Sequence, residues 1–455
     1  MNRLYQSTNI IFRFADRVVY HASLVVRLSH QLLQLLLQGS SKWMINLFSL
    51  VVFILLLIPY WVYMIKNYLF SPTLIKNIEY TPGGSRNRNL LDLYLPVELK
   101  DEKTNNNTNS HPPKKPVIIF LCGGAWIIGY KMWSFFVCQG LADLGIICVV
   151  PDYRNFPQGN ADDMLIDVNN AIKWTISNIH KYNGDPDSIS IGGQSAGAHL
   201  AITLLALWYK DASKHKQIPT STSSNDISPN KLDDSLDSLA NDDNLPPDAL
   251  FTWKTSPKST MKKRIDEIRN TFDYADLTRI KVFIGISGPY NLPVLKEILH
   301  TKGLDSSIFT NIFNDDIDKY SPVTIFSDIL SENSINHDTT NSIFPKVVLF
   351  HGSADKSVPL ASSLELVDIL KKMNITANCH VYEGWSHTDA ILEGPMSCGG
   401  KHPSEYRFFQ DMSKYIYATN RDGDNKVFTN DVLKANVDEV NSNVLIHIAR
   451  FCNPF

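Results

Sequence analysis

Three side chains that lie far apart in the sequence have the types and the order needed for nucleophilic attack on a carbonyl carbon. Ser195 is the centre of Gly193-Gln194-Ser195-Ala196-Gly197, which matches the G-x-S-x-G turn that exposes a nucleophilic serine. Asp355 follows one later apolar run and His387 follows the next. A serine hydroxyl needs a base to take its proton, and the resulting imidazolium needs a carboxylate. The sequence therefore predicts His387 as the base and Asp355 as the acid that orients it.

A second glycine-rich stretch has the composition of an oxyanion-binding loop. Gly123, Gly124 and Ala125 directly follow the apolar run Val117–Cys122. Backbone N–H groups can approach a substrate oxygen closely where side chains are small or absent, and a glycine-rich loop directly after a buried strand can supply such donors. We expect these three residues to form the oxyanion hole with the N–H of Ala196, which begins a helix.

Each of these features has a second interpretation when it is taken alone. A Gly/Ser turn often has no chemistry, an aspartate in such a turn usually bonds to its own backbone, and a lone histidine is more often a packing residue. Their order along the chain, each after an apolar run, favours the triad. Asp152 ends another such run, and we expect it to support a turn with Arg154.

The spacing of apolar residues predicts a sheet that brings these loops to one edge. Continuous apolar runs are typical of strands buried on both faces of a parallel sheet, and their carboxyl ends meet at one edge. Strands alternate with helical periodicity, which indicates an α/β-hydrolase fold with a mostly parallel, doubly wound sheet. The predicted elements are a hairpin at Asn77–Pro96, strands at Val117–Cys122, Gly145–Tyr153, Ser188–Gln194, Lys281–Ser287, Lys346–His351 and Ala377–Glu383, and helices at Asp162–Tyr182, Ala196–Lys210 and Leu292–Ile312.

The amino-terminal region contains the most apolar stretch of the chain. Leu47–Ile65 has no charged residue and is long enough to cross a hydrocarbon layer of about 30 Å, so we predict a transmembrane helix. A core helix or a signal peptide are the alternatives, but the run is long for the first and begins far from Met1 for the second. Val18–Gln38 mixes apolar and polar residues at near-helical spacing and predicts an amphipathic, interfacial helix.

Composition divides the chain and excludes some partners. We predict a membrane-anchoring segment over residues 1–70, a hydrolase domain over 71–420 with polar insertions near 211–244 and 331–342, and a carboxyl-terminal tail over 421–455. The net charge of −3 and the lack of a basic stripe argue against nucleic acid as a partner. The six cysteines form no C-x-x-C motif, so we expect mostly buried free thiols, no metal site and no cofactor.

Four stretches together resemble the isoprenylcysteine α-carbonyl methylesterase family. The resemblance extends over roughly 18–417 apart from the insertions, and it implies a carboxylesterase-like α/β hydrolase of endoplasmic reticulum and Golgi membranes. It also implies hydrolysis of the methyl ester of a carboxyl-terminal prenylcysteine, so the expected partners are prenylated proteins or prenylcysteine methyl esters and membrane lipid. The stretches that carry it are Leu121–Lys131 (LCGGAWIIGYK), Asp152–Gln158 (DYRNFPQ), Gly192–His199 (GGQSAGAH) and Ile286–Asn291 (ISGPYN).

The resemblance assigns the same nucleophile, acid, base and oxyanion loop that the residues predict. The chain departs from the family pattern at Cys122, where related hydrolases often have His or Thr. An apolar groove for the prenyl chain would need large side chains near the site. Candidates that are equally compatible with core packing are Trp126, Tyr130, Trp133 and Trp385. A broad-specificity membrane-bound carboxylesterase is the alternative enzyme, and an inactive hydrolase fold used for adhesion or scaffolding is the alternative outside enzymology.

Overall fold

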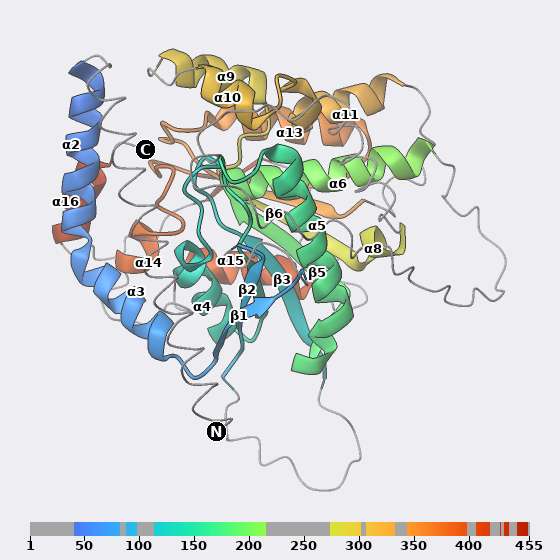
Figure 1. Cartoon of the computed structure of the whole chain (residues 1–455), viewed down its shortest axis with the longest axis horizontal. Helices are drawn as coiled ribbons and strands as arrows, with labels where there is room; N and C mark the ends of the chain where they lie inside the picture. Colours follow the sequence, from blue (N-terminus) through green and yellow to red (C-terminus); the bar gives the residue numbers. More distant parts are fainter. Residues whose placement is uncertain are drawn as a thin grey trace, which may run out of the picture.

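The structure is a computed structural model, and it describes residues 41–81, 88–97, 113–214, 274–301, 306–332, 344–397, 406–418, 428, 432–435 and 444–453. Helices lie on both sides of one sheet (Figure 1). The strands are β1 (Leu74–Glu79), β2 (Leu90–Tyr94), β3 (Lys115–Leu121), β4 (Ile147–Pro151), β5 (Gly184–Gln194), β6 (Ile280–Ile286), β7 (Lys346–Gly352), β8 (Ala377–Tyr382) and β9 (Val432–Ala435). The α-helices are α2 (Ser41–Leu56), α3 (Ile58–Phe70), α4 (Phe135–Asp143), α5 (Ala161–Asn178), α6 (Ala196–Lys214), α8 (Tyr274–Arg279), α9 (Leu292–Thr301), α10 (Ser306–Ile312), α11 (Pro322–Ser331), α13 (Leu360–Lys372), α14 (Glu393–Ser397), α15 (Arg407–Tyr417) and α16 (Val444–Cys452).

The nine strands of the described chain form one sheet in the order β1-β2-β4-β3-β5-β6-β7-β8-β9. β1, β2 and β4 pair antiparallel, and every pair from β4 through β3 to β9 is parallel. The predicted hairpin and the six predicted strands after it are therefore confirmed. The parallel arrangement brings the ends of β3, β5, β7 and β8 to the same edge of the sheet, where the predicted site residues follow.

Two apolar cores cover the two faces of this sheet. Successive residues of β3 alternate between them, because side chains of a strand point to opposite faces. Val117 and Ile119 belong to the core formed with α5, α6, α11 and α13, and Ile118 and Phe120 belong to the core formed with α3, α4 and α15. Both faces of the central strands are buried, which explains why their sequences are continuously apolar.

The amino-terminal apolar run does not form the single continuous helix that the sequence predicts. α2 ends at Leu56 and α3 begins at Ile58, because Pro59 in the first turn of α3 has no N–H for the carbonyl of Leu55. None of the helices in the described ranges combines the length and the apolar character that crossing a membrane requires. In place of one continuous helix over Leu47–Ile65, the chain therefore has two shorter helices, which lie on the outside of the protein (Figure 1).

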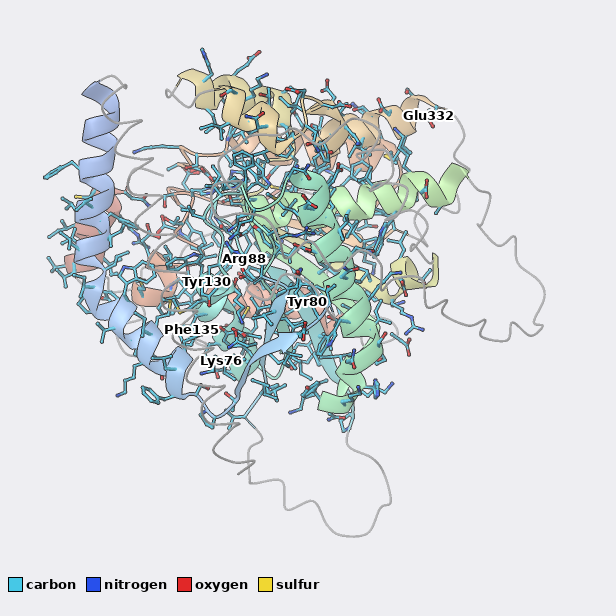
Figure 2. All side chains as sticks on the ribbon, viewed as in Figure 1. Lys76, Tyr80, Arg88, Tyr130, Phe135 and Glu332 are labelled. Carbon is cyan, nitrogen blue, oxygen red and sulfur yellow. The ribbon has the colours of Figure 1, made fainter. Side chains whose placement is uncertain are left out.

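α2 and α3 bury one side and expose the other. Phe53, Leu57 and Met64 are buried in the core that contains α4 and α15. Phe48 and Phe70 are 70% and 78% exposed. Side chains along both helices project away from the body of the protein (Figure 2), so an apolar surface lies on this side of the molecule.

The carboxyl-terminal region is more than a tail in the structure. β9 lies within residues 421–455, yet it adds to the sheet beside β8, with Cys379 opposite Val432. α16 lies beside α2 (Figure 1) and buries Ile446 and Ala449 in the same core. Parts of the predicted tail therefore belong to the hydrolase fold.

Several sequence predictions fall on residues outside the described ranges. These are the amphipathic helix over Val18–Gln38, nearly all of the insertion near 211–244 and most of the insertion near 331–342.

The described cysteines are free, and four of the five are buried, as the sequence predicts. The buried four are Cys122, Cys138, Cys148 and Cys379.

Candidate active site

Ser195 lies on the sharp turn between β5 and α6. Its φ of +52° is in the left-handed region, which is rare for a residue with a side chain and is typical of a nucleophile turn. A Cβ on Gly197 would lie 2.2 Å from the carbonyl oxygen of Leu121, and one on Gly193 would lie 2.6 Å from the same atom. The two glycines therefore let the turn lie against β3, as the G-x-S-x-G pattern predicts.

Asp355 lies on the loop after β7 and has a fully buried side chain. Its Oδ1 accepts hydrogen bonds from the backbone N–H groups of Ser357 and Val358, at 2.8 and 2.9 Å. Its Oδ2 lies 2.8 Å from Nδ1 of His387. The backbone bonds fix the carboxylate, so that one oxygen faces the imidazole.

His387 lies on the loop after β8, and it is tied to the serine turn as well as to Asp355. Nε2 of Gln194 donates a 3.3 Å hydrogen bond to the carbonyl oxygen of His387. The structure thus brings the three predicted loops together at one edge of the sheet. Among the described contacts the side chains of Ser195 and His387 are not joined by a hydrogen bond, a bond that often tightens only with substrate.

The protonation of Asp355 is set by opposing effects. Burial by itself raises the pKa of this carboxyl. The charge of His387 and the hydrogen bonds from His351 and His387 outweigh burial, and they hold the pKa of Asp355 well below its usual value. Asp355 is therefore an anion at neutral pH, which is the form that stabilises an imidazolium.

His351 is a second histidine at this carboxylate, and the sequence interpretation missed it. Its Nε2 lies 3.2 Å from Oδ2 of Asp355 and 3.0 Å from the carbonyl oxygen of Val358. Its Nδ1 lies 2.7 Å from Oγ of Ser363 on α13. A neutral ring with its proton on Nε2 satisfies all three partners, since the Ser363 hydroxyl then donates to Nδ1. The only signal in the sequence is a histidine at the end of β7, four residues before Asp355.

The glycine-rich loop after β3 lies directly beside the serine turn. A Cβ on Gly123 would lie 2.9 Å from the backbone oxygen of Gln194, so only glycine fits there. Gly124 has a φ of +133° and Ala125 a φ of +50°, which turns the loop sharply. In the described chain, the hydrogen bonds of loops and turns include none from the N–H groups of Gly124, Ala125 and Ala196. These donors suit an oxyanion.

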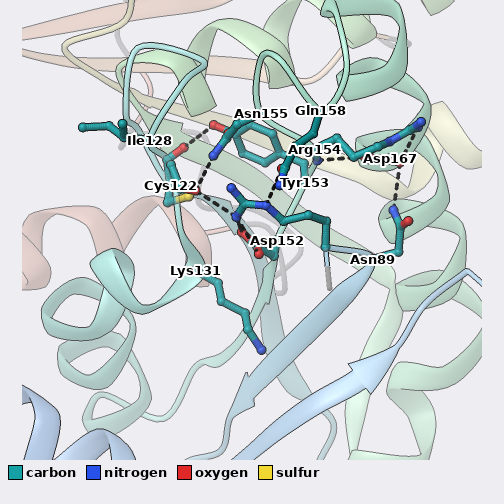
Figure 3. A network of polar contacts seen from close by, with 12 residues as sticks. Asn89, Cys122, Ile128, Lys131, Asp152, Tyr153, Arg154, Asn155, Gln158 and Asp167 are labelled. Atoms are coloured by element: carbon teal, nitrogen blue, oxygen red, sulfur yellow. Dashed lines mark hydrogen bonds and ion pairs between the residues drawn. The ribbon is translucent and has the colours of Figure 1, made fainter. Parts of the chain in front are cut away.

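A network behind this loop holds its two ends (Figure 3). The Tyr153 hydroxyl donates to the carbonyl oxygen of Cys122 at 2.8 Å, and Nδ2 of Asn155 donates to that of Gly129 at 2.6 Å. Nη1 of Arg88 also donates to the Gly129 carbonyl, at 3.1 Å. The loop between β4 and α5 therefore holds the oxyanion loop at both ends, Cys122 and Gly129.

Asp152 supports this network with a different partner from the one the sequence predicts. Its carboxylate pairs with Arg88 at 2.9 Å, whereas Arg154 pairs with Asp163 and Asp167 at the start of α5. Burial raises the pKa of Asp152 to about 6, against the lowering effect of Arg88. Sequence proximity favoured Arg154, but β2 pairs antiparallel with β4, and this brings Arg88, just before β2, to Asp152 directly after β4.

The four predicted aromatic residues occupy different surroundings. Trp126 is buried and contacts the rings of His199, Phe309 and Phe313, with its Nε1 donating to Nδ1 of His199 at 3.3 Å. Trp385 is buried and stacks on Tyr382. These two therefore pack in the core.

Trp133 and Tyr130 lie nearer the surface. Trp133 is 39% exposed and meets the edge of Trp61 on α3, with ring centroids 5.8 Å apart. Its Nε1 donates to the carbonyl oxygen of Ile128, whose own side chain is exposed. Tyr130 is half-buried. Trp133 thus connects the end of the oxyanion loop with the apolar surface of α3.

The arrangement suits acyl transfer through a serine. It combines a strained serine turn, an imidazole held by an anionic carboxylate, and backbone N–H groups that make none of the described loop and turn hydrogen bonds between backbone atoms. Within the described residues no three His, Cys, Asp or Glu side chains are grouped so as to hold a metal ion.

Comparison with known proteins gives consistent matches. A family model described as BD-FAE matches residues 91–370. An isoprenylcysteine alpha-carbonyl methylesterase of Arabidopsis thaliana is 32% identical over 434 residues, which cover 95% of this chain and 82% of that protein. A probable isoprenylcysteine alpha-carbonyl methylesterase of Oryza sativa subsp. japonica is 31% identical over 407 residues, or 89% and 78% of the two chains.

Solved structures show a similar fold. An inhibited esterase B from Lactobacillus rhamnosis superposes with a TM-score of 0.51 at 12% identity, covering 82% of this chain and 96% of that one. This likeness supports the α/β-hydrolase fold.

Proposed function

Because the chain belongs to the isoprenylcysteine alpha-carbonyl methylesterase family and is a carboxylic ester hydrolase, we propose that it cleaves the methyl ester of carboxyl-terminal prenylcysteine. The observation that carries the proposal is the pairing of His387 with the buried carboxylate of Asp355 beside the strained turn of Ser195. The products are a free carboxylate and methanol.

The proposed reaction uses the predicted residues in order. Ser195 Oγ attacks the ester carbonyl while His387 takes its proton, and Asp355 stabilises the imidazolium. The N–H groups of Gly124, Ala125 and Ala196 bind the oxyanion. His387 returns the proton to the leaving methoxide, and methanol departs. Water, activated by His387, then cleaves the acyl-enzyme and releases the carboxylate.

The substrate class is tested by comparing two esters with the same enzyme. We expect kcat/KM for a farnesylcysteine methyl ester to exceed that for a short-chain acyl ester, since the first adds apolar contact area. Ser195→Ala should abolish both reactions. Equal rates for the two esters would instead favour a broad-specificity carboxylesterase, while activity that survives in Ser195→Ala would contradict the nucleophile.

We propose that the prenyl chain lies along Trp133 rather than against the buried Trp126 or Trp385. The supporting observation is that Trp133 is 39% exposed and touches Trp61 of α3. Trp133→Ala is therefore expected to raise KM for the farnesyl ester and to leave the short-chain ester unaffected. A parallel loss on both esters would place Trp133 in general support of the site.

The apolar surface of α2, α3 and α16 is the proposed site of membrane attachment. A contiguous exposed apolar surface is unusual for a protein in water, and helices with one apolar face lie in the membrane interface. Attachment of this kind needs no crossing helix. Exposed apolar side chains on this surface include Phe48, Leu55, Val62, Leu69, Phe70 and Val444.

Attachment is measured by flotation of the full chain with phosphatidylcholine vesicles. We expect the triple variant Phe48→Glu, Leu55→Glu, Phe70→Glu to lose vesicle binding while retaining activity on a short-chain ester. A matched control places glutamate at Val97 and Val294, which are exposed apolar residues elsewhere. Unchanged flotation of the triple variant would count against this surface.

We propose the cytosolic face of endoplasmic reticulum and Golgi membranes as the location, since prenylated proteins are found there. Asn374 is exposed and begins an Asn-x-Thr acceptor sequence, and Asn106 begins another outside the described residues. Neither site should carry a glycan in cells that express the protein. A shift in mobility after glycosidase treatment would contradict the proposed location.

A further inference from the structure

The loop that carries His387 is held by the carboxyl-terminal segment of the chain. We propose that Arg450 and Asn453 are positioning residues, which fix this loop so that His387 faces the serine. This inference rests on the proposed role of His387 as the base. Neither residue reaches the reacting atoms, so both act through the residues on either side of His387.

Asn453 bonds to both sequence neighbours of His387. Its Nδ2 donates to Oγ of Ser386 at 3.1 Å and to Oγ1 of Thr388 at 2.9 Å. The same nitrogen lies 2.6 Å from Oε1 of Glu393, which also accepts a 2.9 Å bond from the Thr388 hydroxyl. Asn453 is only 6% exposed, so these bonds form away from competing water.

Arg450 reaches the same loop through Asp389. Its Nε donates to Oδ1 of Asp389 at 2.8 Å, and Oδ2 of Asp389 accepts a 2.8 Å bond from the backbone N–H of Ser386. The Asp389 side chain is 3% exposed and that of Arg450 is 34% exposed. Arg450 therefore orients a buried carboxylate that in turn holds the backbone just before His387.

Arg450 lies on a fixed element, α16 (Val444–Cys452), and Asn453 directly follows the last residue of that helix. α16, which ends at Cys452, buries Ile446 and Ala449 against the core and contacts α2 and α14. The residues from Gly384 to Asp389 form no helix or strand, so they lack the backbone ladder that fixes β8 before them. The side chains of Arg450 and Asn453 take the place of that ladder.

The ring of His387 has to be placed accurately, because it must bond to two partners on opposite sides. Nδ1 bonds to Asp355, and Nε2 has to meet the serine hydroxyl at the same time. A misplacement of about 1 Å in such a site lowers the rate by up to about 100-fold. Freeing Ser386 and Thr388 allows a shift of this size at His387.

The test compares Asn453→Ala and Arg450→Ala with two controls in the full-length protein. Asn178→Ala and Arg279→Ala remove an asparagine that bonds to the Trp174 carbonyl and to Lys181, and an arginine that pairs with Asp187, all remote from the site. Kinetics use a short-chain p-nitrophenyl ester, with active sites counted by fluorophosphonate titration. We expect kcat per active site to fall about 10- to 100-fold in the test variants, with little change in KM.

Arg450→Lys keeps a cation beside Asp389 and should restore part of the loss. The rate of fluorophosphonate labelling should fall in parallel with kcat, because labelling needs the same proton transfer. The proposal is overturned if the test variants lose thermal stability but keep wild-type kcat per titrated site. If Asn453→Ala does not fold, Arg450→Ala, at a third-exposed side chain, decides the question alone.

Failure of this inference is distinguishable from failure of the proposed substrate. An enzyme that hydrolyses the short-chain ester but ignores the farnesyl ester contradicts the substrate class and leaves the positioning test intact. Normal kcat on both esters in Arg450→Ala and Asn453→Ala contradicts the positioning role alone.

Discussion

Replacing Asp355 by asparagine tests the site at its most constrained point. Oδ1 of Asp355 accepts from the N–H groups of Ser357 and Val358, so the amide oxygen of an asparagine should occupy that position. The amide nitrogen then occupies the Oδ2 position, 2.8 Å from Nδ1 of His387. A donor at that position requires Nδ1 to accept, which places the ring proton on Nε2, facing the serine.

The expected loss of activity in Asp355→Asn follows from the free-energy cost of the other orientation of the asparagine amide. Turning the amide round would restore an acceptor for His387 and for His351, which keeps the Val358 carbonyl in either orientation, but it would set the NH2 group against two backbone donors. Two buried unsatisfied donors cost about 1–3 kcal/mol each, so the wrong tautomer of His387 is favoured. Serine hydrolases lose about 10⁴-fold in kcat by this route, which is about 5 kcal/mol of barrier.

The assay measures kcat on a short-chain ester at pH 7, together with the tautomer of His387 by ¹⁵N NMR. Asp328→Asn is the matched control, because Asp328 pairs with Lys210 at 3.1 Å on the surface with a side chain that is 55% exposed. The control should retain wild-type kcat. Activity of Asp355→Asn within tenfold of wild type would refute the assignment of Asp355 as the acid that orients the base.

Three further predictions follow from burial and close contact. Burial, and secondarily the charge of Asp389, raises the pKa of Glu393, so the folded state keeps a proton that the unfolded state has lost above about pH 4.3. The free energy of unfolding therefore falls as the pH rises above about 4.3. Glu393→Gln should raise the melting temperature more at pH 9 than at pH 6. An equal rise in melting temperature at the two pH values would contradict this. His351→Ala removes a ring that lies 3.2 Å from Oδ2 of Asp355 and 3.0 Å from the Val358 carbonyl oxygen, so kcat on a short-chain ester should fall as the carboxylate loses this support, and wild-type kcat would exclude this role. Gly197→Ala places a Cβ 2.2 Å from the Leu121 carbonyl oxygen, so the free energy of unfolding in urea should fall by about 1–3 kcal/mol and esterase activity should be lost. Wild-type stability would show that the turn can shift to accommodate the methyl group.

Local sequence signals were sufficient wherever a residue's neighbours in the chain decide its environment. The elbow of Ser195 depends on glycines within two residues, and the strands depend on continuous apolar runs. The break before Pro59 was also readable, since proline lacks the N–H that a continuous helix needs, but a count of apolar residues does not register it.

Other features depend on contacts between distant segments. Nothing near Asn453 in the sequence indicates that it bonds to Ser386 and Thr388, more than sixty residues earlier. Arg88 meets Asp152, sixty-four residues later, only because β2 and β4 pair in the sheet. No spacing rule predicts such pairs, because the distance between them is set by how whole elements pack.

The amino-acid sequence by itself determined the nucleophile turn, the glycine-rich loop and the parallel sheet that carries them, because each follows from local backbone sterics and from apolar periodicity. Only the tertiary structure decided that His351 shares the carboxylate of Asp355 and that α16 holds the loop of His387. The physical reason is that hydrogen bonds between buried side chains form wherever packing excludes water, and packing is a property of the whole chain.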